Sequence, residues 1–119
     1  MSTEELRRSS CVACRGGEPP LDDDGIAALK PDVPEWRVVE KDGIKRLTRA
    51  FKFKDFRAAL AFANRVGELA EREQHHPDLH VAWGKVVVET WTHKIRGLHR
   101  NDFILAAKTD ALFVEPAAV

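Results

Sequence analysis

The chain has 119 residues, the length of a single domain that buries about two thirds of its unfolded surface on folding. Its 19 basic and 19 acidic residues balance, so the composition favours neither nucleic acid nor an anionic membrane surface as a partner. Uncharged stretches are too short to cross a bilayer, and the N-terminal sequence MSTEELRRSS lacks the apolar segment of a signal peptide. We therefore expect a globular, cytoplasmic protein.

Residues 1–20 are polar and end in a run of glycine and proline without apolar periodicity, so we expect a flexible or surface-wrapped arm. The arm carries the pair Cys11-x-x-Cys14. Two cysteines are too few for a secreted disulfide framework, and the pair is half of a zinc ribbon whose second half is missing. Inert thiols and a zinc ion shared between subunits both stay open. We expect residues 21–119 to form one domain.

The first predicted elements are a short helix and a hairpin. The aspartates at 22–24 offer a cap and first-turn acids to the helix, which Pro31 ends. Strands are predicted over residues 36–40 and 44–53, because the Asp-Gly pair at 42–43 is a strong turn signal.

The longest helix is predicted over residues 55–73, and Pro77 prevents its continuation. Its expected buried face is formed by Phe56, Leu60, Ala63, Val66 or Gly67, and Ala70. Strands over 79–83 and 85–93 follow, and a last helix spans 101–112. Hairpins separated by helices predict an α+β fold, with a four-stranded antiparallel sheet and helices packed on one face.

Three histidines lie within nineteen residues, beside the predicted sheet: His75, His76 and His93. Clustered imidazoles indicate proton transfer or metal binding, because the unperturbed pKa of imidazole lies near neutrality. A metal site built from these rings and Asp102 is less favoured, since adjacent side chains diverge and no H-x-x-x-H spacing is present. A purely structural role of the doublet at a helix C-terminus also stays open.

The last predicted strand has two different faces. Alternation places Val86, Val88, Thr90 and Thr92 on the core face, and Val87, Glu89, Trp91 and His93 on the other. An indole beside an imidazole suits a planar heterocyclic ligand better than plain solvent. His80 and His99 are expected at the surface without a chemical role, with His99 where the cap of the last helix belongs.

Several segments together resemble the pterin-4a-carbinolamine dehydratase family in its bacterial form. The similarity is carried by Cys11–Leu21, Leu47–Phe56, Ala70–Leu79, Thr90–His93 and Asn101–Asp110, with the signature His75-His76-Pro77, Trp83, His93 and Asp102. One departure is His99, where the family usually has Ser or Thr, so the hydroxyl of a helix cap is missing.

The resemblance implies dehydration of a 4a-hydroxytetrahydropterin to the quinonoid dihydropterin, without metal or organic cofactor, in the recycling of pterin for aromatic amino acid hydroxylases. It also implies assembly into homodimers or homotetramers. The implied site contains the catalytic histidines His75, His76 and His93 and the pterin-pocket residues Gln74, Trp91, Thr92 and Lys94.

Within this implied site we expect His75 and His93 to transfer protons while His76 holds the pterin. Asp102 is expected either to orient an imidazole or to cap the last helix.

The resemblance leaves two other functions open. Some members of the family stabilise the dimer of a transcription factor through their helical face, which here is helix 55–73. The other is a pterin-related role in molybdenum-cofactor metabolism. Partner binding would survive substitution of the histidines, whereas dehydration would not.

Overall fold

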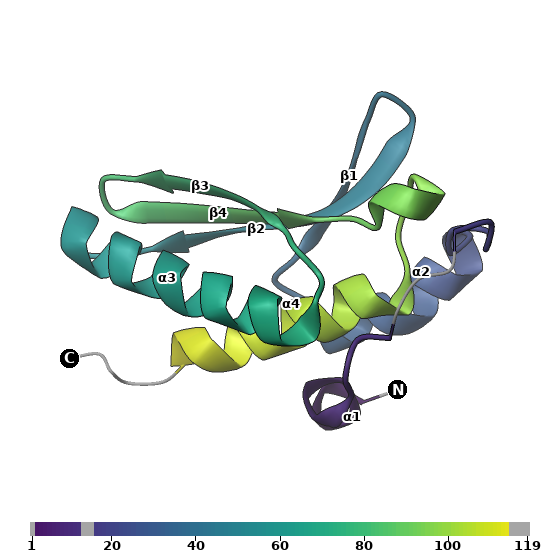
Figure 1. Ribbon diagram of the computed structural model, residues 1–119, viewed down its shortest axis with the longest axis horizontal. Helices are drawn as coiled ribbons and strands as arrows, with labels where there is room; N and C mark the ends of the chain where they lie inside the picture. The colour runs from purple at the N-terminus through teal and green to yellow at the C-terminus, as the bar shows by residue number, and fades with distance from the viewer. Residues whose placement is uncertain (1, 13–15, 115–119) are drawn as a thin grey trace.

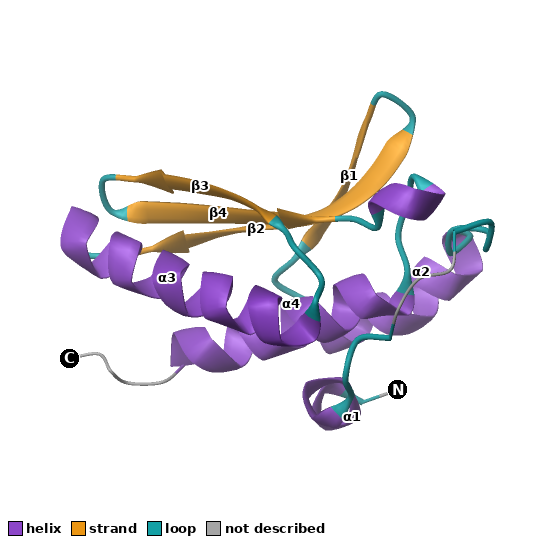
Figure 2. Ribbon diagram, viewed as in Figure 1, coloured by secondary structure: helices purple, strands orange, loops and turns teal. Residues whose placement is uncertain are grey.

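The computed structural model describes residues 2–12 and 16–114. Its helices and strands are α1 (Thr3–Arg8), α2 (Asp23–Leu29), β1 (Arg37–Lys41), β2 (Ile44–Lys52), α3 (Phe56–Glu73), β3 (Asp78–Ala82), β4 (Lys85–Thr90) and α4 (Arg100–Val114), with the 3₁₀ turns η1 (Lys30–Asp32) and η2 (His93–Ile95). The strands form one antiparallel sheet in the order β1-β2-β4-β3, and α3 and α4 cover one face of it (Figures 1 and 2). This arrangement confirms the predicted α+β fold. No helix in the described ranges is long and apolar enough to span a membrane.

Tight turns fix the register of both hairpins. Asp42 and Gly43 join β1 to β2, and both have positive φ, 54° and 76°, as a type I′ turn requires. Gly84 lies in the turn between β3 and β4 with φ 71°, and a Cβ added there would lie 3.0 Å from the carbonyl oxygen of Phe53. Glycine is therefore needed at this position for its backbone conformation and for space.

Strand β4 has the predicted core face but a different end. Val86, Val88, Thr90 and Thr92 are all buried, as the alternation predicts. The strand ends at Thr90 rather than at residue 93, because the chain reverses in η2. Thr92 then pairs with Gly97 in an isolated bridge.

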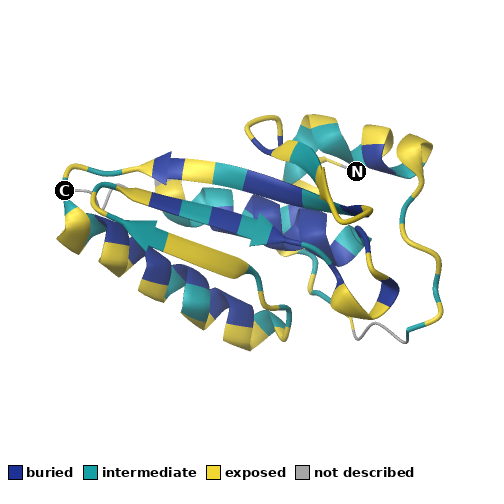
Figure 3. Cartoon of the chain, turned by 90° about the horizontal axis from the view of Figure 1, so that it is seen from above, coloured by how far each residue is buried: buried dark blue, intermediate teal, exposed yellow. Residues whose placement is uncertain are grey.

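Helix α3 buries a face rotated from the predicted one. The buried residues are Ala59, Phe62, Ala63, Val66, Leu69 and Ala70, and these turns face the sheet in Figure 3. Phe56 and Leu60 are instead 45% and 42% exposed. The rotation follows from Phe62, whose ring packs 4.8 Å from Phe51 and 5.1 Å from Phe53, centroid to centroid, and so directs its own side of the helix toward the sheet.

The N-terminal segment contains a helix that the sequence analysis did not predict. Ser2 and Glu5 form a capping box at the start of α1, and Leu6 is fully buried. Helix α1 packs on α4, which is buried from Asn101 to Ala107. A single apolar residue gives no periodicity, so only the Ser-x-x-Glu spacing signals this helix in the sequence. Cys14 of the predicted pair lies outside the described residues.

Candidate active site

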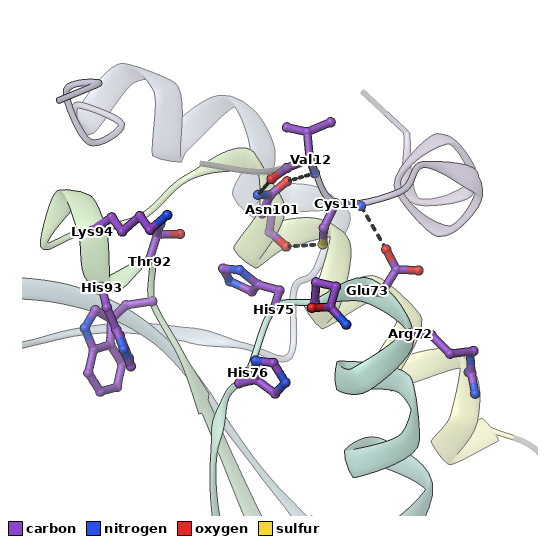
Figure 4. Close-up of a pocket in the computed structure, with 12 residues that line it drawn as sticks. Cys11, Val12, Arg72, Glu73, His75, His76, Thr92, His93, Lys94 and Asn101 are labelled. Carbon is purple, nitrogen blue, oxygen red and sulfur yellow. Dashed lines mark hydrogen bonds between the residues drawn. The ribbon is translucent and has the colours of Figure 1, made fainter. Parts of the chain in front are cut away.

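The histidines converge on a cavity of about 550 Å³ between the C-terminal end of α3, the loop after β4 and the start of α4 (Figure 4). The predicted site residues that line it are Gln74, His75, His76, Trp91, Thr92, His93 and Lys94. The lining is completed by Cys11, Val12, Arg72, Glu73 and Asn101. Asp102 lies behind the wall, in contact with His75. The structure thus brings the predicted side chains to one place.

The end of α3 determines where the histidine doublet lies. Gln74 has the left-handed conformation, φ 56° and ψ 37°, and its N–H and that of His75 both reach the carbonyl of Ala70. The side-chain amide of Gln74 also donates to the backbone carbonyl of Glu71, at 2.8 Å. The chain therefore turns sharply after the helix, and His75 lies against α4.

Asp102 is fully buried and is surrounded by hydrogen-bond donors. Its Oδ1 lies 2.6 Å from His75 Nε2 and accepts from the Thr90 hydroxyl at 2.7 Å. Its Oδ2 accepts from the Thr92 hydroxyl at 2.8 Å and from the His99 N–H at 2.9 Å. The last contact is a helix cap and the first holds the imidazole, so Asp102 makes both contacts that the sequence analysis left as alternatives.

His99 completes the cap of α4. Its Nδ1 accepts a hydrogen bond from the Asn101 N–H at 3.0 Å, which leaves the ring proton on Nε2, 3.5 Å from a carboxylate oxygen of Glu18. The ring nitrogen takes the place of the missing hydroxyl. The expectation that His99 has only a surface role is wrong, because its side chain is 16% exposed and forms the helix cap.

The other two histidines have more open surroundings. His76 is 58% exposed in its side chain, with Nε2 2.5 Å from Glu71 Oε2. His93 lies against Trp91, with ring centroids 4.4 Å apart, and the Arg46 guanidinium is 3.9 Å from the Trp91 centroid. The indole is therefore held by two neighbours at the edge of the cavity.

The side chains of the histidine doublet contact different partners. Within residues 2–12 and 16–114, no group of three or more His, Cys, Asp or Glu side chains is arranged to hold a metal ion. His75 and His76 instead contact two different carboxylates, Asp102 and Glu71. This is the divergence expected of adjacent side chains.

The sequence matches the family described as pterin 4 alpha carbinolamine dehydratase over residues 19–112. The chain belongs to this family. A protein of Chlorobium luteolum, provisionally named a pterin-4-alpha-carbinolamine dehydratase, is 55% identical over 111 residues, 93% of this chain and 97% of the relative. A Gloeobacter violaceus protein with the same provisional name is 53% identical over 114 residues, 96% of this chain and 98% of the relative.

Two solved structures have a similar fold. The transcriptional coactivator/pterin dehydratase from Brucella melitensis superposes with a TM-score of 0.72 at 32% identity, over 79% of this chain and 98% of that one. A pterin dehydratase-like protein described as a RuBisCO assembly factor in the alpha-carboxysome shares the fold, with a TM-score of 0.56 at 23% identity, over 66% of this chain and 88% of that one.

The sequence analysis made no prediction of where Trp83, Cys11 and Val12 lie relative to the cavity. Trp83 lies in the turn between β3 and β4, 73% exposed, and does not line the cavity. Cys11 and Val12 do line it, although they precede the matched residues 19–112. The sequence signal for the second point was the similarity of the segment Cys11–Leu21 to bacterial members of the dehydratase family.

Proposed function

We propose that the chain dehydrates a 4a-hydroxytetrahydropterin to the quinonoid dihydropterin and water by histidine acid–base catalysis. The observation that carries this proposal is the convergence of His75, His76 and His93 on one cavity, with His75 held by the buried carboxylate of Asp102. Membership of the dehydratase family supports the choice of substrate. The product would be recycled for an aromatic amino acid hydroxylase.

His75 is suited to act as the base. Its Nε2–H donates to the Asp102 carboxylate, which fixes the tautomer, and Nδ1 has no hydrogen-bond partner among the described residues. That lone pair can take the proton from N5 of the substrate, and the buried carboxylate stabilises the positive charge on the ring. His93, which is exposed beside Trp91, is suited to supply a proton to the departing hydroxyl.

The reaction needs no other reactant. The N5 lone pair forms the C4a–N5 double bond as the C4a–O bond breaks, and the hydroxyl leaves as water with a proton from His93. His75 removes the proton from N5, whose N–H electron pair becomes the new lone pair on nitrogen. One proton is taken up and one is released, so exchange with solvent restores both rings.

The remaining cavity residues would hold the pterin. The flat face of Trp91 suits a bicyclic ring, and His76, Lys94 and Gln74 supply polar groups at the rim. Thr92 lines the cavity, but its hydroxyl donates to Asp102. We therefore assign Thr92 a role in positioning Asp102.

The deciding experiment follows the decay of 4a-hydroxytetrahydropterin by absorbance with wild type and His93→Ala. We expect the wild type to accelerate decay and the variant to lose about 10²–10⁴-fold of that acceleration, since it lacks one acid–base group. Circular dichroism checks that the variant is folded. The matched control is His80→Ala, an exposed histidine on β3 outside the cavity, which should retain activity.

Each outcome of that assay has a defined meaning. A folded His93→Ala variant with near-native turnover removes His93 from the mechanism, and a wild type without acceleration contradicts the dehydratase function. Activity should persist after exhaustive chelation, and a loss that zinc restores would support a metal-dependent reaction instead.

A second function, protein binding, is supported by the surface between α3 and the edge strand β3. A groove there is lined by Leu60, Ala63, Asn64, Gly67, Glu68, Glu71, Leu79 and Val81. Leu60 and Leu79 are 42% and 36% exposed, and β3 pairs on one side only within the described sheet. The name of the Brucella melitensis relative joins coactivator and dehydratase. We propose that the occupant of this groove is a second copy of the chain, in a homodimer.

A further inference from the structure

Two residues of the N-terminal segment form part of the cavity wall. Cys11 and Val12 line the cavity together with His75, although 64 and 63 positions separate them from it in the sequence. Figure 4 shows this segment beside Asn101 and Glu73, above the end of α3. The acid–base mechanism assigns no role to Cys11 or Val12.

Asn101 holds the backbone of this segment at two points. Its Oδ1 accepts from the Val12 N–H at 3.0 Å, and its Nδ2 donates to the Val12 carbonyl at 2.6 Å. The side chain of Asn101 is buried, with the residue 2% exposed. A buried amide whose two ends both bond to one residue has a fixed orientation, so the position of Val12 depends directly on Asn101.

Glu73 holds the preceding residue. Its Oε1 accepts from the Cys11 N–H at 2.8 Å, and its Oε2 accepts from Lys108 on α4 at 2.8 Å. Glu73 immediately precedes Gln74 at the end of α3, and Asn101 immediately precedes Asp102. The two side chains that hold the segment therefore adjoin the two that shape the active site.

The anchorage continues on the N-terminal side of the wall. Leu6 of α1 is fully buried in the core, and Arg100 donates to the hydroxyl of Ser9 at 3.1 Å. The Cys11 thiol lies 3.5 Å from the Asn101 carbonyl oxygen. The segment Ser9–Val12 is thus held at Ser9, at Cys11 and at Val12.

We propose that Asn101 and Glu73 are positioning residues that hold Cys11 and Val12 as a wall of the substrate cavity, and that this wall sets the affinity for the pterin. The affinity claim rests on the proposed function. The wall adds contact area next to His75, so it contributes to binding without taking part in proton transfer.

The Cys11 thiol is expected to line the cavity without reacting. Burial, with the nearby negative charges of Glu73 and Asp102, raises the pKa of the Cys11 thiol to about 12. The thiol is therefore neutral near pH 7 and is a poor nucleophile. Its reactivity consequently reports whether the segment is held in place.

The test uses Asn101→Ala and two readouts, both in a Cys14→Ser background that leaves one thiol. The first is the Kd of 7,8-dihydrobiopterin by calorimetry, which we expect to rise about tenfold as the wall loosens. The second is the rate of Cys11 alkylation by iodoacetamide at pH 8. We expect a rise of more than tenfold, because a released thiol returns toward its ordinary pKa near 8.5.

Further variants distinguish the loss of the contact between Asn101 and Val12 from a failure of the protein to fold. Val12→Pro removes the N–H that Asn101 accepts without changing α4, so it tests the same contact if Asn101→Ala does not fold. Asn101→Asp keeps the acceptor but sets a buried carboxylate oxygen against the Val12 carbonyl, so an effect at least as large as that of Asn101→Ala is expected. Asn64→Ala, an exposed asparagine on α3 outside the cavity, is the matched control and should change neither readout.

The outcomes distinguish this inference from the proposed function. Unchanged alkylation and unchanged Kd in both Asn101→Ala and Val12→Pro overturn the inference, and so does faster alkylation with an unchanged Kd. A wild type that does not bind 7,8-dihydrobiopterin rejects the proposed function together with the affinity claim. In that case faster alkylation still supports the holding role of Asn101.

Discussion

Asp102 connects the proposed base, His75, to the buried polar groups around it. Its two oxygens receive four donors, from His75, Thr90, Thr92 and the backbone of His99. A buried carboxylate needs such partners, because an unpaired charge away from water is strongly unfavourable. The same network that satisfies the charge fixes the ring of His75, so the geometry of the proposed base is determined by the core of the protein.

We predict that Asp102→Asn reduces kcat by roughly 10²-fold, because the amide can no longer accept on both sides and so cannot fix the tautomer of His75. The variant should also lose about 1–2 kcal/mol of unfolding free energy, since one cap contact of α4 is weakened. Steady-state kinetics and urea melts measure the two effects.

The matched variant for that experiment is Thr90→Val, which removes one donor and keeps the carboxylate. It should change kcat much less than Asp102→Asn does. A kcat equal to wild type in folded Asp102→Asn would show that the contact with His75 is purely structural.

The sequence analysis predicted which histidines lie close together but not all of the residues that surround them. His75, His76 and His93 stand out because imidazoles are rare and the doublet precedes Pro77. The contact of His75 with Asp102 joins residues 27 positions apart, and no local pattern specifies such a pair. The cap formed by His99 was also missed, since the rule for caps names oxygen acceptors and not a ring nitrogen.

At the level of elements, the residue at the C-terminal end of α3 connects three parts of the chain. The C-terminal residue of α3, Glu73, connects to α4 through Lys108 and to the N-terminal segment through the Cys11 N–H. Burial raises the pKa of Glu73, but the hydrogen bonds from Lys108 and from the Cys11 N–H outweigh it, and the pKa lies below its ordinary value. These contacts stabilise the ionised form of Glu73 in the folded state.

A pH dependence of stability follows from this direction. With a lowered pKa in the folded state, the unfolded chain binds more protons in acid, so the contribution of Glu73 is complete above its ordinary pKa and is lost as the pH falls through the folded value. We predict that Glu73→Gln costs about 1–2 kcal/mol at pH 7 and much less near pH 3. Urea melts at both pH values measure the difference.

The control for that measurement is Glu68→Gln, an exposed glutamate on the same helix, for which little change is expected at either pH. A Glu73→Gln effect of equal size at pH 7 and pH 3 would show that shape, and not charge, accounts for the contribution of Glu73.

Element types were predictable where the pattern is local. The Asp-Gly turn, the alternation in β4 and the aspartates at the start of α2 each predicted the correct structure. The rotation of α3 about its axis was not predictable, because Phe56, Leu60 and Phe62 are all apolar. Only the aromatic partners of Phe62 in the sheet decide which of these three residues is buried. Helix α1 depends on packing against α4, nearly a hundred residues later.

On the scale of the whole molecule, helices cover one face of the sheet (Figure 1). The groove between α3 and β3 stays accessible. An edge strand with exposed apolar side chains is a ready site for pairing with another chain. The order of hairpins and helices predicted the layers, whereas the accessible groove follows from the rotation of α3 and so could not be read from the sequence.

We predict that Leu79→Lys weakens self-association at least tenfold, because a charge would be buried in the proposed dimer contact. Sedimentation velocity over a range of concentrations measures the monomer–dimer equilibrium. Trp83→Lys is the matched control, since it also replaces an exposed apolar residue of the same hairpin but lies outside the groove.

A variant of the cavity completes the comparison. His93→Ala should associate like wild type, which separates the groove from the cavity. A wild type that is monomeric at all concentrations would exclude the second copy as the occupant.

The double contact of Asp102 has a consequence for how this family can diverge. A descendant that abandoned catalysis would be free to exchange its imidazoles, yet selection for a stable α4 would still retain the carboxylate. Inactive proteins with this fold would thus keep the carboxylate at position 102 after activity is lost. Asp102 is therefore a poor marker of a working enzyme, and the histidines that face the cavity are the informative ones.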